Sequence, residues 1–351
     1  MRIDRHDGYL WDRTGEPDDE VVRLEAVLGT LRHEGSLRVL PRECPAAPED
    51  GRRWRVRAVQ ALYVASALAA ALVLLGVGAA AWVTLVQPRI GWAVEAVAGA
   101  PVVDGRIVDG SARLGIGRWL TTDGASRARL AVGQIGRVDV EPNTRLQLVE
   151  SRGREHRMSL AQGTIHARIW APPKFFFVNT PSAVAVDLGC AYTLQVQEDG
   201  SGLVRVTHGW VGFEHGGREA FIPEHAVCAT RPGIGPGTPQ YEDAPAAYAG
   251  ALAILDFGAP GDERRPAALD AVLSQARPRD ALTLWHLLQR GTPDERARVY
   301  DRMSVVAPPP SGVTRTAVLA GDRRAIDAWW NSLGLDSTTW WRLWTGRSPE
   351  F

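Results

Sequence analysis

The sequence predicts a mainly β domain that is preceded by one transmembrane helix and followed by an all-α segment. Three patterns carry this prediction: an uncharged apolar run over residues 58–86, alternating runs broken by glycine over 92–230, and helix-capping signals beyond residue 245. The chain has 351 residues, with 40 basic and 40 acidic side chains. Because this balance lacks the basic excess of nucleic-acid-binding proteins, we expect no direct nucleic-acid partner.

Residues 1–57 form a tail in which one amphipathic helix is predicted. Pro17 and the acidic residues after it suit the first turn of a helix, and Gly35 suits its end. A helix of this length cannot bury an apolar stripe on itself, so the stripe predicts either a partner protein or contact with the lipid surface. Four residues at heptad-like spacing form the stripe and are the candidate partner-binding residues: Val21, Leu24, Leu28 and Leu31.

The 29 residues of the run over 58–86 include no charged side chain. A run of about 20 apolar residues is enough to span a bilayer, and one this long is not typical of a buried core helix. A cleaved signal peptide is the competing interpretation, but the tail before the run is too long for the n-region of a signal peptide. Trp54 and Tyr63 near one end of the run, and Trp82 and Trp92 near the other, are candidate interfacial anchors.

Charge around the predicted span indicates its orientation. Arginines crowd its N-terminal side, whereas Arg89 alone lies close to its C-terminal side. By the positive-inside rule, the tail stays in the cytoplasm and the chain from about residue 88 onward is exported. We therefore expect a single-pass protein of a bacterial inner membrane, with a cytoplasmic N-terminus and a periplasmic or extracellular C-terminus. The clustered arginines are Arg52, Arg53, Arg55 and Arg57.

Residues 92–230 consist of short alternating runs, which predict an all-β domain of the sandwich, barrel or solenoid type. The clearest strand runs from Val184 to Val196. Cys190 shares the parity of the apolar residues on this strand, so its side chain is predicted to point toward the core.

A Gly/Pro-rich linker is predicted over 231–245 and a helical segment over 246–351. One helix has a clear predicted start, with Thr292 as N-cap, Pro293 at the first helical position and Glu295 as capping-box partner. Five tryptophans near the C-terminus are predicted either to fill the core of the helical unit or to form a partner-docking surface. They are Trp329, Trp330, Trp340, Trp341 and Trp344.

The sequence contains no recognisable catalytic, metal or cofactor site, and we expect no enzyme. The histidines of the β region lack the cysteine or carboxylate spacing of a metal site, and no phosphate-binding loop stands between a strand and a helix. Cys190 and Cys228 are the only cysteines of the predicted exported part. Because an exported compartment favours oxidised pairs, a Cys190–Cys228 disulfide is predicted, with two unpaired core residues as the alternative.

Three motifs follow one another in the β region: "PNTRLQL" (142–148), "FVNTPSAVAVDLGCAYTLQV" (177–196) and "VRVTHGWVGFEHGG" (204–217). In this order they resemble the FecR family of membrane-anchored signalling regulators, over about residues 92–230. The resemblance implies a tail that binds an extracytoplasmic-function sigma factor and an exported β domain that receives an envelope signal.

The resemblance also implies a self-cleavage position, which family members have between a glycine and a threonine and which Gly189 and Cys190 occupy here. In that chemistry the side chain after glycine attacks the preceding carbonyl, an ester replaces the amide, and water opens the ester. A cysteine would form a thioester instead. Self-cleavage between Gly189 and Cys190 is therefore a hypothesis for this chain.

Two functions of different classes follow from the sequence. The leading hypothesis is a single-pass FecR-like regulator of the anti-sigma type, whose tail engages a sigma factor or a related cytoplasmic protein. The alternative is a membrane-anchored structural or binding protein of the envelope that has no sigma-factor partner.

Overall fold

The computed structural model describes residues 19–29, 71–78 and 91–335, apart from residues 154 and 260. The first of these ranges is helix α2 (Asp19–Gly29), and residues 71–78 are also helical. In these ranges, none of the helices combines the length and the apolar character that a membrane span needs. The span expected over 58–86 lies outside the described residues, except for 71–78.

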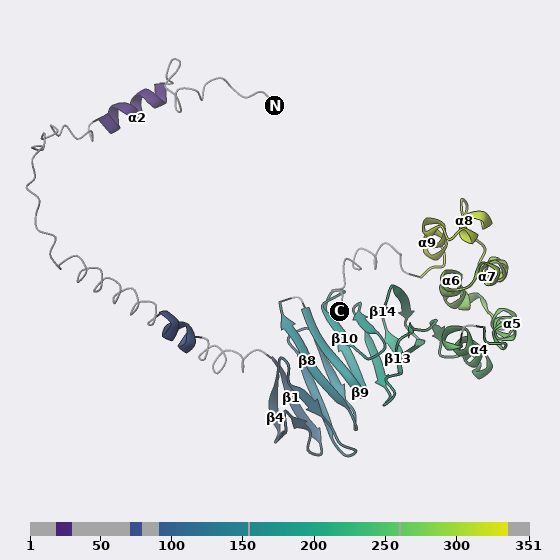
Figure 1. Cartoon of the computed structure of the whole chain (residues 1–351), viewed down its shortest axis with the longest axis horizontal. Coiled ribbons are helices and arrows are strands. Elements are labelled where there is room, and N and C mark those ends of the chain that lie inside the picture. Colours follow the sequence, from purple (N-terminus) through teal and green to yellow (C-terminus); the bar gives the residue numbers. More distant parts are fainter. Residues whose placement is uncertain (1–18, 30–70, 79–90, 154, 260, 336–351) are drawn as a thin grey trace, which may run out of the picture. The chain divides into compact units, whose positions relative to one another are not determined.

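Residues 91–241 form two β-sheets around one core (Figure 1). Sheet A runs in the order β4 (Ser111–Gly115), β1 (Gly91–Ala98), β6 (Arg127–Val132), β7 (Gly136–Val140), β9 (Glu155–Ile169), β12 (Ala191–Val196), β13 (Gly202–His208) and β16 (Ala226–Arg231), and β16 also pairs with β17 (Gly235–Pro236) and β18 (Gln240–Tyr241).

Sheet B runs in the order β3 (Arg106–Ile107), β2 (Val102–Val103), β5 (Trp119–Thr121), β8 (Arg145–Arg152), β9, β10 (Phe176–Asn179), β11 (Val184–Asp187), β14 (Trp210–His215) and β15 (Arg218–Pro223). Among the described strand pairs, only β9 and β10 are parallel. Along the chain, β6 and β7 belong to sheet A, β10 and β11 to sheet B, β12 and β13 to sheet A, and β14 and β15 to sheet B. Consecutive pairs of strands therefore alternate between the two sheets.

Strand β9 belongs to both sheets. Its first half pairs with β8 and β10 in sheet B, and its second half pairs with β7 and β12 in sheet A. The halves meet at Gly163, whose φ is +101°. A Cβ on Gly163 would lie 2.3 Å from Oγ1 of Thr144, the hydroxyl that accepts a hydrogen bond from the Thr164 N–H at 3.0 Å. Glycine is therefore required where β9 turns from one sheet into the other.

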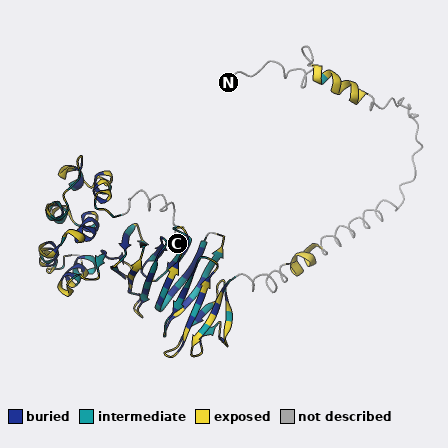
Figure 2. Ribbon diagram, turned by 180° about the vertical axis from the view of Figure 1, so that it is seen from behind, coloured by how far each residue is buried: buried dark blue, intermediate teal, exposed yellow. Residues whose placement is uncertain are grey.

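Inward side chains from both sheets form a shared core, and Figure 2 shows the buried residues concentrated along the strands. Cys190 is 2% exposed, as predicted, but the single strand expected over Val184–Val196 is wrong: it consists of β11 and β12, which lie in different sheets and are joined by a turn at residues 188–190. Trp92 on β1 is fully buried, with its ring 6.0 Å from the ring of Phe176. The prediction that Trp92 anchors the chain at a membrane interface is therefore wrong, because the start of β1 already belongs to the core.

Helices follow the sheets, which confirms the predicted combination of a mainly β domain and C-terminal helices. Thr292 caps one of them and forms the predicted reciprocal capping box with Glu295. The elements are α4 (Ala246–Phe257), α5 (Arg265–Gln275), the 3-10 helix η3 (Pro278–Asp280), α6 (Ala281–Arg290), α7 (Pro293–Val306), α8 (Arg315–Leu319) and α9 (Arg323–Asn331).

Two of the five C-terminal tryptophans are core residues. Trp329 and Trp330 on α9 are fully buried, and the ring of Trp330 lies 4.5 Å from that of Trp285 on α6 and 6.1 Å from that of Trp210 on β14. Trp330 therefore joins the helices to sheet B. The other three, Trp340, Trp341 and Trp344, lie outside the described residues.

Helix α6 covers the outer edge of β15, a strand that pairs only with β14 within the described part of the chain. The Phe221 N–H on this edge donates to Nε2 of His286 at 3.1 Å, and the Glu219 carbonyl accepts from Arg290 at 2.5 Å. Burial, together with the charge of Arg290, lowers the pKa of His286 to about 3, so the ring is neutral and can accept. The helices thus remove an exposed sheet edge that could pair with other chains.

The predicted linker over 231–245 is in large part not a linker. Residues 235–239 are buried, and β17 and β18 within this segment both pair with β16. Thr238 donates from its N–H and its hydroxyl to the Asp256 carboxylate of α4, at 2.6 and 2.8 Å. Gly237 lets the chain pass close to β16 and α4, because a Cβ there would lie 2.7 Å from the ring of Phe257 and 3.2 Å from the Ala229 carbonyl.

We expect Gly163→Ala to destabilise the protein strongly. Gly110 is the matched control, because it also has a positive φ, of +69°, but a Cβ there would have no atom within 4 Å. Gly110→Ala should cost about 1 kcal/mol of unfolding free energy for the backbone conformation alone, whereas Gly163→Ala should cost about 1–3 kcal/mol more because of the clash with Thr144. Urea unfolding of both variants measures the difference, and equal losses would contradict the role of Gly163.

Candidate functional site

The turn between β11 and β12 holds the residues of the self-cleavage hypothesis. Asp187, at the end of β11, accepts hydrogen bonds from the Gly189 N–H at 2.7 Å and from the Cys190 thiol at 2.9 Å. The carboxylate therefore holds both residues of the predicted cleavage position. Asp187 is itself 1% exposed, although on a single strand from Val184 to Val196 it would lie on the opposite face from Cys190.

Burial controls the protonation states of Asp187 and Cys190 in this turn. It raises the pKa of Asp187 to about 7, although the hydrogen bonds from Cys190 and Gly189 act in the opposite direction. Burial, with a smaller contribution from the Asp187 charge, raises the pKa of the Cys190 thiol well above its usual value. The thiolate is the reactive form of cysteine, so this environment disfavours attack on the Gly189 carbonyl. Self-cleavage stays a hypothesis in which Asp187 is the nearest proton acceptor.

The predicted Cys190–Cys228 disulfide is not formed, because both thiols are free and buried. Cys228 on β16 pairs with Val204, which in turn pairs with Leu194 on β12. Leu194 is four residues from Cys190, or about 13 Å along a strand. A disulfide requires Cα atoms within about 7 Å. The register therefore keeps the two cysteines apart, and the Cys228 thiol instead donates to the Gly237 carbonyl at 3.1 Å.

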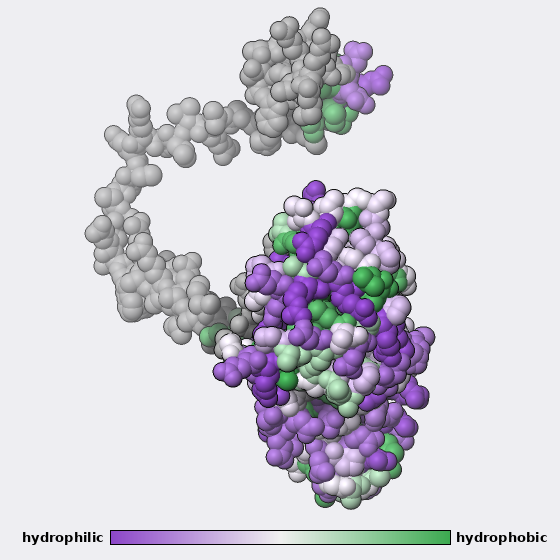
Figure 3. Space-filling view, turned by 90° about the vertical axis from the view of Figure 1, so that its right-hand side faces the viewer, coloured by the Kyte–Doolittle hydropathy of each residue, from purple (hydrophilic) through white to green (hydrophobic). Residues whose placement is uncertain are grey.

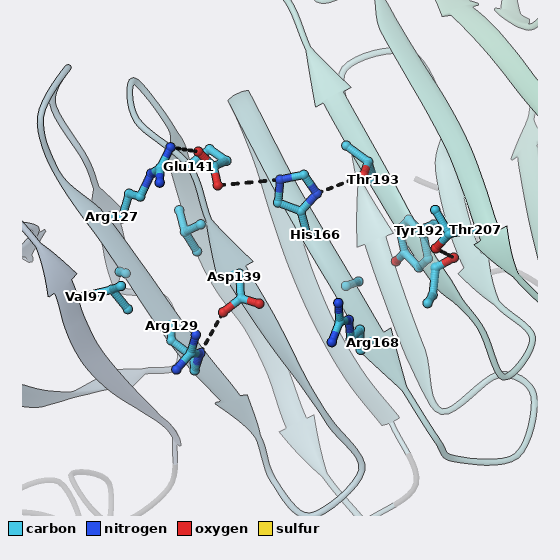
Figure 4. A pocket seen from close by; sticks show the side chains of 14 residues that line it. Val97, Arg127, Arg129, Asp139, Glu141, His166, Arg168, Tyr192, Thr193 and Thr207 are labelled. Carbon is cyan, nitrogen blue, oxygen red and sulfur yellow. Dashed lines mark hydrogen bonds and ion pairs between the residues drawn. The ribbon is translucent and has the colours of Figure 1, made fainter.

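The outer face of sheet A carries a groove that crosses β1, β6, β7, β9, β12 and β13 (Figure 4). It encloses about 350 Å³. Side chains of one row across the strands meet in it, because the sheet register places Arg129, Asp139, His166 and Thr193 opposite one another in turn. Sequence periodicity could place each of them on the outer face of its strand but could not bring the strands together.

Most charged groups of the groove are partnered within it. Arg127 pairs with Glu141 at 3.0 Å, and Arg129 donates from Nε to Asp139 at 2.6 Å. His166 lies between Glu141, at 3.5 Å from Nε2, and the Thr193 hydroxyl, at 2.8 Å from Nδ1. The hydrogen bond with Asp139 and the charge of that carboxylate raise the pKa of Arg129. The groove is thus a polar surface with fixed donors and acceptors.

The tail helix α2 presents its predicted stripe to solvent as far as the structure describes it. Leu24 and Leu28 are 60% and 57% exposed, and Val21 is half-buried. Leu31 lies outside the described residues. No residue of α2 is buried within this helix.

Part of the β domain matches a known protein family. Residues 119–212 match the family model described as FecR protein, which confirms the predicted resemblance over this range. The match runs from β5 into β14 and includes the turn at Gly189 and Cys190. It is shorter than the predicted range of 92–230.

Two solved structures are similar to this chain, both of a candidate anti-sigma factor from Parabacteroides distasonis ATCC 8503. Each is 16% identical, with a TM-score of 0.32, and the similarity covers 38% of this chain. It covers 63% of the other protein in one structure and 62% in the other, so this chain spans less than two thirds of that protein. Comparison with curated proteins finds no match.

Asp187 should make stability depend on pH. Its folded pKa of about 7 exceeds the unfolded value of about 4, so the contribution of the neutral carboxyl is complete below pH 4 and is lost as the pH rises through 7. Between these values the wild type should lose up to about 1.4 kcal/mol per pH unit relative to Asp187→Asn, which retains an acceptor for the Gly189 N–H. Urea unfolding of both proteins at pH 5 and pH 8 tests this, and a difference that does not change with pH would disprove it.

Proposed function

We propose that this chain, which carries a FecR domain over residues 119–212, is a single-pass inner-membrane regulator of the anti-sigma type. In this proposal the tail engages an extracytoplasmic-function sigma factor or a related cytoplasmic protein, and the β domain receives a signal in the exported compartment. The family match is the observation that carries the proposal. The apolar run over 58–86 and the arginines before it supply the anchor and its orientation.

The exposed apolar stripe of α2 favours the hypothesis that the tail binds a protein partner. An isolated helix of the length of α2 has little stability in water, and an apolar stripe exposed to solvent adds no packing energy. Insertion of Leu24 and Leu28 into a groove of a partner would supply that energy, as in other complexes that place a helix in a groove. Lipid contact is the competing explanation for the same stripe.

The β domain and the C-terminal helices favour a module that receives a signal over an enzyme. Its surface on the side of the helices is mostly hydrophilic, with small separate apolar patches (Figure 3). The groove on sheet A is a polar hollow that suits ligand recognition. This groove also favours the second candidate function, an envelope binding protein in which the span is only an anchor. The two candidates differ in whether the tail has a cytoplasmic partner.

We expect Leu24→Asp combined with Leu28→Asp to abolish capture of a sigma factor by the full-length chain. A charge buried in a helix-binding groove costs several kcal/mol, so capture should fall by at least about a hundredfold. Val22→Asp combined with Ala26→Asp is the matched control, because it adds the same charges at the same spacing on the opposite face of α2. The measurement is co-purification with each sigma factor of the host. No enrichment of any sigma factor by the wild type would favour the second candidate function.

The orientation has its own test. A reporter that is active only in the exported compartment should work when it is fused after Phe351 and stay silent when it is fused after Gly51. The clustered arginines before the span are the physical reason, because positively charged flanks remain in the cytoplasm. The opposite pattern of activity would show that the tail is exported and would overturn the proposed location.

A further inference from the structure

Two arginines lie directly opposite each other on the outer face of sheet A. The register pairs Arg137 of β7 with Arg168 of β9. Neither guanidinium has an ion pair with any described residue, and Nε of Arg137 is buried without a hydrogen-bond partner. Like charges directly opposite each other on a sheet destabilise it. Such a local conflict is expected where a protein keeps residues for binding.

Small side chains leave space on both sides of this arginine pair. The register places Ala131 of β6 next to Arg137, and Ala191 of β12 next to Arg168. Arg168 and Ala191 both line the groove, and Arg168 points into it (Figure 4). The positive charge of Arg168 therefore lies in a hollow of about 350 Å³, and Arg137 adjoins it through the strand register.

Two β-bulges flank the groove. Val97 is the extra residue of β1 opposite β6, and Thr207 is the extra residue of β13 opposite β12. Both side chains line the groove. Bulges increase the local twist of a sheet and redirect side chains, and they are common beside binding sites. The two bulges therefore lie at opposite ends of the groove.

The neighbouring groups suit a ligand that has hydroxyl groups as well as a negative charge. The next row supplies carboxylate, imidazole and hydroxyl groups from Asp139, His166 and Thr193. One position beyond Arg168 on the same face, Trp170 is 66% exposed, and its Nε1–H donates to the Gln134 carbonyl at 3.0 Å. This bond fixes an exposed aromatic ring beside the arginine pair.

We propose that this groove, together with the adjoining Arg137 and Trp170, binds a sugar acid, either free or as a unit of an acidic glycan. The carboxylate of the ligand lies between Arg137 and Arg168 and removes their repulsion through charge-assisted hydrogen bonds. The hydroxyls of the ligand bond to Asp139, His166 and Thr193, and its apolar ring face packs on Trp170. The inference goes beyond the regulatory proposal and does not depend on it, because binding is measured without any cytoplasmic partner.

Calorimetric titration of the full-length chain tests the site. D-glucuronate should bind, whereas D-glucose, which lacks the carboxylate, and acetate, which lacks the hydroxyls, should bind at least about tenfold more weakly, since a charged hydrogen bond is worth more than 1.4 kcal/mol. An oligomer of D-glucuronate distinguishes the two sources: binding of the oligomer without the monomer identifies a glycan, and binding of the monomer identifies the free acid.

Variants locate the site. Arg168→Gln and Arg137→Gln should each weaken the binding of whichever acid binds by at least about tenfold, and Arg106→Gln on β3 of sheet B is the control that should not change it. Because each variant at the site also relieves the repulsion, its melting temperature should equal or exceed that of the wild type, which separates lost binding from lost folding. No binding of either acid, equal binding of acetate or glucose, or unchanged binding by both site variants would overturn the proposal.

Discussion

The continuity of β9 through both sheets is the constraint on which the rest of the β domain depends. Its first half pairs with β10, which leads through β11 to the turn at Gly189 and Cys190. Its second half lies between β7 and β12, which places His166 and Arg168 in the middle of the groove. Both candidate sites are therefore positioned by one strand, and the strand can turn only because Gly163 carries no Cβ beside Thr144.

The junction between sheet B and the helices makes the β and helical parts share one core. Asp256 of α4 is 5% exposed and pairs with Arg218 at 2.9 Å, and Arg290 of α6 lies 3.6 Å from it. Burial lowers the pKa of Arg290 to about 10, so it is still charged at neutral pH. Removing one partner of such a buried set leaves an uncompensated charge, which is strongly destabilising. The helices are thus better described as a cover of the sheet edge than as a separate module on a linker.

Two places in the β domain keep polar groups in unfavourable surroundings. Asp187 is a buried carboxyl whose pKa is raised to about 7 by burial, and Arg137 faces Arg168 without a counter-charge among the described residues. Neither arrangement improves packing, whereas the surrounding strands otherwise alternate apolar and polar side chains in the usual way. Local conflicts of this kind are typical of functional positions, where stability is given up for chemistry or binding.

The sequence by itself determined what depends on neighbouring residues. Alternation predicted a mainly β region and the inward side chain of Cys190, although it joined β11 and β12 into one strand. Local hydrogen-bonding chemistry predicted the cap at Thr292, and the three ordered motifs predicted the FecR resemblance that the family model matches over residues 119–212. The tertiary structure decided what depends on register and on contacts between distant segments. Because of these contacts, Cys190 lies away from Cys228 and Trp92 lies in the core. Residues 235–239 are buried rather than part of a linker, and Arg137 lies opposite Arg168. Periodicity states only which face of its own strand a side chain occupies, whereas its neighbours are set by strand pairing between residues far apart in the chain.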